Sequence, residues 1–179
     1  MYWGLDGSFL YGEEGDNNPY VLLQGGAGIV DTGTTLLYIS TGKLLCDFNS
    51  HEICVHIISP TLDAYNRYVK RTGAFLDPDT GFLRISQEKY DGLQSLFLNF
   101  GGSIYELIPN AQIWPRAQNG VIGGKQDYIY LVVHDMGQTS SGLDFIAGMV
   151  FLERYYSVFD TDNHRIGLAS TQYTYAEIN

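Results

Sequence analysis

Short segments of strand-forming residues, separated at close intervals by glycine-containing turns, dominate this sequence. Its 179 residues include 21 glycines, 14 tyrosines and 9 phenylalanines. Aromatic residues favour strands, and glycine supplies the backbone conformations that tight turns require. We therefore predict a mostly-β fold with a few short helices. A chain of this length can form one domain with a substantial core.

The predicted strands follow one another closely along the chain. They comprise residues 2–11, 20–23, 28–30, 82–85, 96–100, 104–108, 128–133, 155–159 and 165–169. Gly25-Gly26 is expected to separate the second strand from the third. Glycine and polar residues at 101–103 and 160–164 predict two hairpins, because such residues form tight turns between strands.

Two helices are predicted in the middle of the chain. Ser59 can cap the first one, Pro60 fits its first helical position, and Gly73 ends it. Three apolar residues at helical spacing are expected to face the core: Leu62, Tyr65 and Val69. A second, shorter helix is predicted at 86–92.

The charge of the chain excludes several classes of function. Its net charge is −10, from 20 acidic and only 10 basic residues, so no basic stripe exists to bind nucleic acid. No apolar run is long enough to span a membrane, and we expect no membrane partner. No phosphate-binding glycine loop follows a predicted strand, and we expect neither a cofactor nor a metal. The first residues do not resemble a secretory signal peptide.

Asp31 is the leading candidate for a catalytic residue. It lies in the run Gly28-Ile29-Val30-Asp31-Thr32-Gly33-Thr34, where an apolar strand ends in a tight turn. Threonine hydroxyls can donate hydrogen bonds to a carboxylate, and Gly33 allows a backbone N–H to approach it. The motif occurs once, since Asp79-Thr80-Gly81 follows a proline and is predicted to be an ordinary turn. A carboxylate that activates water usually needs a second carboxylate nearby, and the chain contains only one copy of this strand-and-turn motif.

A second group of motifs lies far downstream of Asp31. The run LDFIAGMVFLERYYSVFD at 143–160 is followed by Arg-Ile-Gly-Leu-Ala at 165–169. This order of an apolar pair with glycine, a short helix, an aromatic strand and a hairpin resembles the C-terminal lobe of pepsin-like aspartic proteases. Two further segments add to the resemblance, residues 2–4 and 111–116. Residues 111–116 and 143–148 are most similar to fungal, polyporopepsin-like members.

The resemblance implies a fold and a set of site residues. Residues 1–179 would form a single lobe of the pepsin-like β-barrel fold with an incomplete start. Asp31 would be one of two aspartates that share a proton and activate water for peptide-bond hydrolysis at acid pH. Thr32 would lock the loop to its partner loop, while Gly33 and Thr34 would donate hydrogen bonds to the carboxylate. Two residues match the element that packs under this loop: Ile146 and Gly148.

The resemblance also implies partners that this sequence does not contain. The substrate would be a polypeptide, and the second aspartate would come from a missing N-terminal lobe. A secreted or vacuolar location would follow from the family. Without the second lobe, Asp31 is expected to have an ordinary carboxylate pKa and the chain little or no activity. Two alternatives remain open, namely an inactive or binding lobe, and an enzyme that forms only as a homodimer.

Residues 42–59 are interpreted as an insertion within the lobe, because the family runs almost directly from the aspartate strand into the next helix. The segment contains both cysteines of the chain, Cys46 and Cys54, which could form a disulfide. With His51 and His56 they could instead bind zinc, although the spacing is not that of a standard finger. The ends of the segment can also be encoded by splice-like sequences, so a retained intron is a third interpretation.

Overall fold

The computed structural model describes residues 3–15, 17–41, 63–137 and 142–179. The predicted insertion at 42–59, with Cys46 and Cys54, lies outside the described residues. So does the predicted start of the first helix at Ser59 and Pro60. The architecture below therefore concerns the strands and helices on either side of that segment.

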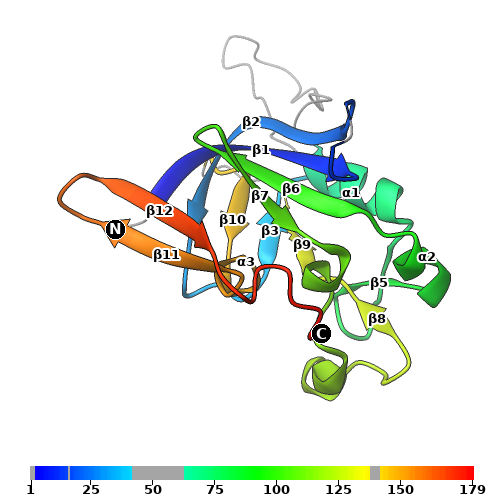
Figure 1. Cartoon of the computed structure of the whole chain (residues 1–179). Coiled ribbons are helices and arrows are strands. Elements are labelled where there is room, and N and C mark those ends of the chain that lie inside the picture. Colours follow the sequence, from blue (N-terminus) through cyan, green and yellow to red (C-terminus); the bar gives the residue numbers. More distant parts are fainter. Residues whose placement is uncertain (1–2, 16, 42–62, 138–141) are drawn as a thin grey trace, which may run out of the picture.

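Seven strands form the main sheet, in the order β7-β6-β1-β2-β10-β3-β9 (Figure 1). Their bounds are β1 Trp3–Gly12, β2 Tyr20–Val30, β3 Leu37–Ile39, β6 Ser95–Phe100, β7 Ser103–Leu107, β9 Val133–Asp135 and β10 Phe145–Ala147. In Figure 1 the long strands β1, β2, β6 and β7 cross the upper part of the molecule, and β10, β3 and β9 lie below them. The predicted mostly-β fold is confirmed.

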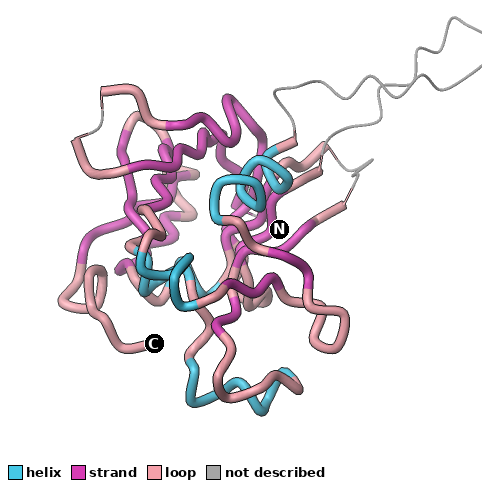
Figure 2. The backbone as a smooth tube through the Cα atoms, turned by 90° about the vertical axis from the view of Figure 1, so that its right-hand side faces the viewer, coloured by secondary structure: helices cyan, strands magenta, loops and turns pink. Residues whose placement is uncertain are grey.

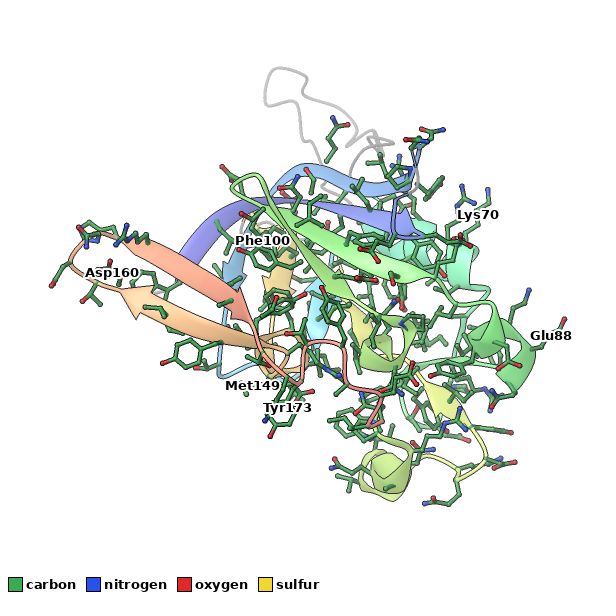
Figure 3. All side chains as sticks on the ribbon, in the orientation of Figure 1. Lys70, Glu88, Phe100, Met149, Asp160 and Tyr173 are labelled. Atoms are coloured by element: carbon green, nitrogen blue, oxygen red, sulfur yellow. The ribbon has the colours of Figure 1, made fainter. Side chains whose placement is uncertain are left out.

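Two smaller sheets complete the β structure. One joins β4 (Phe75–Leu76), β5 (Leu83–Ile85) and β8 (Ile129–Tyr130), and the other is the hairpin of β11 (Tyr155–Asp160) and β12 (Arg165–Ser170). This hairpin projects from the body of the molecule, with Asp160 at its tip (Figure 3). The helical elements are short and lie between strands (Figure 2). They are α1 Ala64–Thr72, α2 Gln87–Asp91, α3 Met149–Leu152 and two 3₁₀ helices at Pro109–Gln112 and Arg116–Ile122.

Both predicted hairpins are present, and local chemistry explains their turns. Gly101 and Gly102 have φ angles of 58° and 85°, the positive values that a two-residue turn between twisted strands requires. In the β11–β12 hairpin, the Asp160 carboxylate accepts hydrogen bonds from the Asn163 N–H at 3.1 Å and from Arg165 Nε at 2.8 Å. The turn residues thus fix the register of each pair of strands.

Two predicted strand boundaries are wrong. Gly25-Gly26 does not separate two strands, because β2 continues through it with an irregular register opposite β1. Gly25 has a φ of 63° there, so it accommodates a bulge instead of ending the strand. Residues 128–133 were expected to form one strand, but the chain passes from β8 in the small sheet to β9 in the main sheet. Between them the Leu131 N–H donates to Leu83 O at 2.8 Å.

The helix before Gly73 is confirmed, but it begins at Ala64 after the N-cap residue Asp63, later than predicted, and its buried face differs from the prediction. Gly73 ends α1 with a φ of 65°, as a left-handed C-cap does. The fully buried residues are Ala64, Tyr68 and Thr72, while Tyr65 and Val69 are only half-buried. On the buried face the Tyr68 ring packs edge to face against Tyr11, and its hydroxyl donates to Gln112 Oε1 at 3.1 Å. The second predicted helix is present as α2, where Ser86 accepts the Lys89 N–H and caps the helix.

An aromatic core holds β10 against the rest of the sheet. Phe145 lies 5.0 Å from Phe9 and 5.6 Å from Phe100 between ring centroids, and Phe151 packs against Phe100. Phe100 points from β6 towards this core (Figure 3). Gly28 is required beside it, since a β-carbon there would overlap the Phe145 ring. The core therefore fixes the position of the strand that leads to Gly148. Among the helices that the structure describes, none is both long and apolar enough to cross a membrane.

Candidate active site

Asp31 lies at the end of β2, in a loop that crosses the end of β10. In the sheet β10 lies between β2 and β3, parallel to the first and antiparallel to the second. The chain must therefore pass over β10 to travel from β2 to β3. The Asp31 N–H donates to Ala147 O at 3.1 Å, which joins the loop to the strand beneath it.

The Asp31 carboxylate accepts two hydrogen bonds from its own loop. Thr34 Oγ1 donates to Oδ2 at 2.7 Å, and the Gly33 N–H donates to Oδ1 at 3.0 Å. The Thr34 hydroxyl and then the Gly33 N–H hold the pKa of Asp31 below its usual value, since both stabilise the charged form. The pKa is thus lower than the ordinary value expected from the sequence. A carboxylate of this kind is ionised in mild acid, so it can accept a proton from water.

The segment after β10 supports the loop through its backbone. The Met149 N–H donates to Thr34 O at 2.8 Å, and the Val150 N–H donates to Thr35 O at 3.0 Å. Gly148 lies directly against the loop, where a β-carbon would lie 2.5 Å from Thr34 O and closer still to Leu36 O. Both obstacles are backbone atoms, which cannot move aside as a flexible side chain can. Glycine is therefore required at 148 for this close approach.

The remaining site residues named from the sequence lie around the loop. Thr32 is exposed at its tip, and its hydroxyl makes no hydrogen bond with the described part of the chain. Ile146 is half-buried and lies beside the loop, where it lines a cavity. Ala147, between Ile146 and Gly148, is completely buried. The exposed side chain of Thr32 is thus accessible to a second domain or a second protein chain.

A cavity of about 670 Å³ opens beside the Asp31 loop. Loop residues form one part of its lining, and aromatic and polar residues from distant segments form the rest. The lining residues are Gly33, Thr34, Thr35, Leu36, Tyr38, Phe82, Trp114, Asp135, Met136 and Ile146. The sequence did not identify Phe82, Trp114 or Asp135 as site residues, because they come from separate segments that only the fold brings together.

The described residues contain no group of three or more histidine, cysteine, aspartate or glutamate side chains that could hold a metal ion. The chemistry available at this site is that of an ionised carboxylate, two hydrogen-bond donors and an adjoining cavity. Such a set can polarise a water molecule and bind an extended chain beside it.

Comparisons with known proteins identify the family to which this chain belongs. A family model for eukaryotic aspartyl proteases matches residues 15–171. Polyporopepsin from Irpex lacteus is 45% identical over 179 residues, which cover 99% of this chain and 45% of polyporopepsin. Mouse cathepsin D is 30% identical over 154 residues, which cover 86% of this chain and 31% of cathepsin D.

A solved structure agrees with these sequence similarities. The crystal structure of the aspartic proteinase from Irpex lacteus superposes with a TM-score of 0.81 at 44% identity, covering 99% of this chain and 45% of that one. The chain thus spans less than half the length of these relatives. From the family match and the similarity to polyporopepsin, we conclude that this chain belongs to the eukaryotic aspartyl protease family, among its pepsin-like members.

Proposed function

We propose that Asp31 is one of two catalytic aspartates of an aspartic-type endopeptidase. The observation that carries this proposal is the carboxylate of Asp31, held by Thr34 and Gly33 at the exposed end of a strand beside a cavity. Membership of the aspartyl protease family supports peptide-bond hydrolysis as the reaction. Thr32, Gly33 and Thr34 would support the active-site loop, and Gly148 would hold it from below.

The proposed reaction uses a water molecule between two carboxylates. The ionised carboxylate takes a proton from the water as its oxygen attacks the peptide carbonyl, and the protonated carboxyl group stabilises the developing charge. Collapse of the tetrahedral intermediate breaks the C–N bond while a proton passes to the leaving nitrogen. Two carboxylates this close cannot both ionise, so they titrate as a pair. With its pKa lowered, Asp31 alone can supply only the base.

We further propose that a second lobe supplies the other aspartate. Residues 1–179 would form one lobe, with 42–59 inserted in it, and polyporopepsin is more than twice as long as the matched region. The isolated chain would then have little or no peptidase activity. Its substrates would be extended polypeptides lying across a cleft between lobes, and a secreted or vacuolar location would follow from the family.

The test is cleavage of a denatured protein at acid pH, with and without pepstatin. We expect little or no cleavage by the 179-residue chain, and pepstatin-sensitive cleavage once it is joined to a lobe that carries a second Asp-Thr-Gly. Asp31→Asn should abolish this cleavage, whereas Asp79→Asn, which removes the same charge from the other Asp-Thr-Gly tripeptide, should preserve it. Cleavage that survives Asp31→Asn would contradict the proposal. Activity of the chain alone as a two-chain species in sedimentation would favour the homodimer over a second lobe.

A further inference from the structure

A second cavity, of about 350 Å³, lies at the opposite end of β2 from the Asp31 loop. Pro19, which directly precedes β2, lines this cavity, whereas Asp31 directly follows the last residue of the 11-residue strand. The two cavities share no lining residue. A side chain bound in the second cavity would therefore not contact the Asp31 carboxylate.

Strand pairing explains the apolar floor of the second cavity. Leu10 in β1 is paired with Phe97 in β6, and Phe97 is paired with Glu106 in β7. Paired residues share one face of a sheet, so these three side chains lie in a row on the same face, and all three line the cavity. Their neighbours Phe9 and Leu98 point the opposite way and are completely buried in the core. The floor is therefore the outer face of the sheet, on the side away from its core.

Exposed apolar side chains extend this surface to either side of the cavity. Ile104 in β7 and Tyr175 near the C-terminus line the cavity and are 61% and 58% exposed. Val21 in β2 is paired with Leu10, so it continues the same face of the sheet, and it is 37% exposed. A ligand longer than one side chain could therefore bury apolar surface beyond the cavity itself.

Three glutamates give the cavity an acidic rim: Glu13, Glu14 and Glu106. Ser95 Oγ donates to Glu106 Oε1 at 2.5 Å. Gln94 Nε2 donates to Glu13 Oε1 at 3.4 Å, and Glu14 accepts no hydrogen bond from the described residues. No lysine or arginine lines the cavity, and none forms a salt bridge with these glutamates in the part of the chain that the structure describes. Neutral groups thus position two of the carboxylates, and no cation compensates the charge of the rim.

An apolar floor beside an acidic rim fits a cationic side chain with a long apolar stem. The methylene groups of such a stem would lose contact with water against Leu10 and Phe97. The rim has carboxylates on two elements, since Glu13 and Glu14 follow β1 and Glu106 lies in β7. A lysine ammonium has three donors that can reach carboxylates on different sides, whereas the planar fork of arginine matches a single carboxylate. The chemistry of the cavity therefore favours lysine.

We propose that this cavity binds a lysine side chain of a partner polypeptide. The stem would lie on Leu10 and Phe97, and the ammonium would approach the free carboxylate oxygens of the rim. The residues on either side of the lysine would pack on Val21, Ile104 and Tyr175, and this exposed apolar surface favours a polypeptide over a free amine. The inference goes beyond the proposed function, because it requires no catalysis at Asp31.

The test is the binding of short peptides to the isotopically labelled 179-residue chain at pH 7 and low salt, followed by NMR. The ligands are N-acetyl-leucyl-lysyl-leucine amide and the same peptide with norleucine at its centre, which keeps the stem but lacks the ammonium. We expect the lysine peptide to bind about tenfold more tightly, a ratio equivalent to about 1.4 kcal/mol, and to shift the amide signals of Phe97 and Ile104. Butylamine should bind more weakly than the lysine peptide. Equal binding of the two would overturn a polypeptide as the occupant.

Variants of the rim decide whether its charge causes the preference. Glu13→Gln combined with Glu106→Gln should reduce the preference for lysine to less than about twofold, although glutamine at 106 retains an oxygen that can accept the Ser95 hydroxyl. The control combines Glu88→Gln with Asp79→Asn, which removes two charges from exposed positions outside the cavity lining and should keep the full preference (Figure 3 labels Glu88). Equal binding of the two peptides, no binding of the lysine peptide, or a preference that survives the rim variant would overturn the proposal. None of these outcomes bears on the cleavage test of Asp31.

Discussion

The chain contains the tripeptide Asp-Thr-Gly twice, and the two copies adopt different structures. In the first, the aspartate accepts hydrogen bonds from Gly33 and Thr34 and so becomes the centre of the loop. In the second, the centre is Asp77, whose Oδ1 accepts the Asp79 N–H at 3.1 Å and whose backbone oxygen accepts the Gly81 N–H at 2.8 Å. The Asp79 side chain is left in solvent. The neighbours of the tripeptide therefore determine which aspartate is held.

The supports of the two loops also differ in their distance along the chain. The turn around Asp79 is built from residues within a few positions, and its glycine has a φ of 74° in open space. The Asp31 loop is pressed instead against Gly148, more than a hundred residues away. The backbone of the Asp79 turn thus forms within one short segment, although the Asp77 side chain at its centre also accepts the Tyr130 hydroxyl from β8. The Asp31 loop depends instead on a distant segment, the residues around Gly148, which must pack directly beneath it.

Gly148→Ala should lower the free energy of unfolding more than any substitution in the Asp79 turn. The added β-carbon would meet the backbone oxygens of Thr34 and Leu36, so we expect a loss of about 3 kcal/mol in the free energy of unfolding, measured in urea. Gly120→Ala is the matched control, because the nearest atom to its β-carbon is a side-chain nitrogen 4.0 Å away. A Gly148→Ala protein as stable as the Gly120→Ala protein would show that the loop does not depend on the close approach.

Asp77→Ala should have the next largest effect and should act on the second turn. Asp77 is buried, and besides the Asp79 N–H it accepts the Tyr130 hydroxyl at 3.1 Å. Its removal leaves that hydroxyl and the Arg84 guanidinium without their carboxylate, and we expect a loss of about 2 kcal/mol in unfolding free energy. Asp79→Ala should change the value by less than about 0.5 kcal/mol. If the two substitutions cost the same, the turn would not be organised around Asp77.

Thr34→Val should have the smallest effect on stability and a specific effect on titration. The hydroxyl of Thr34 is the largest cause of the lowered pKa of Asp31, so its loss should raise that pKa, as measured by NMR of the carboxyl carbon. Thr32→Val is the control, since Thr32 makes no hydrogen bond to Asp31 and should leave the pKa unchanged.

The same substitution should alter how stability depends on pH. Because the pKa of Asp31 is lower in the folded chain, its hydrogen bonds contribute stability that is present above the ordinary value of 3.8 and is lost as the pH falls through the folded pKa. Thr34→Val should make this acid-side loss smaller. An unchanged titration of Asp31 in this variant would mean that Gly33 alone stabilises the carboxylate.

Features that depend on neighbours in sequence could be predicted from the residues themselves. Features that depend on distant segments could not, apart from the packing of Gly148 under the Asp31 loop, which only the resemblance implied. The donors around Asp31 lie within three residues of it, and the glycines of the β6–β7 turn are consecutive, so both could be read directly. The break expected at Gly25-Gly26 is a bulge because β1 continues to pair across it. The buried face of α1 contacts Tyr11 and Gln112, which the helix meets only in the folded chain.

The cavity beside the Asp31 loop is the clearest example of what the sequence could not predict. Three of its lining residues come from different kinds of element and share no spacing in the sequence. Phe82 lies just before β5, Trp114 lies in a loop, and Asp135 lies in the edge strand β9. An isolated tryptophan such as Trp114 usually packs in or beside the core, so its position in the sequence does not mark it as a site residue. Only the placement of β9 beside β3 brings Asp135 and Tyr38 to the same opening.

The position of β10 between β2 and β3 also has a consequence for how the protein is made. A ribosome releases the chain from its N-terminus, and β3 and β9 connect to the rest of the main sheet only through β10. Until residues 145–150 have emerged, that segment cannot accept the Asp31 N–H or donate to the backbone oxygens of Thr34 and Thr35. The contact also joins residues far apart in the chain, and such contacts form slowly. The Asp31 loop thus acquires its support only after residues 145–150 have emerged, more than a hundred residues after Asp31 itself.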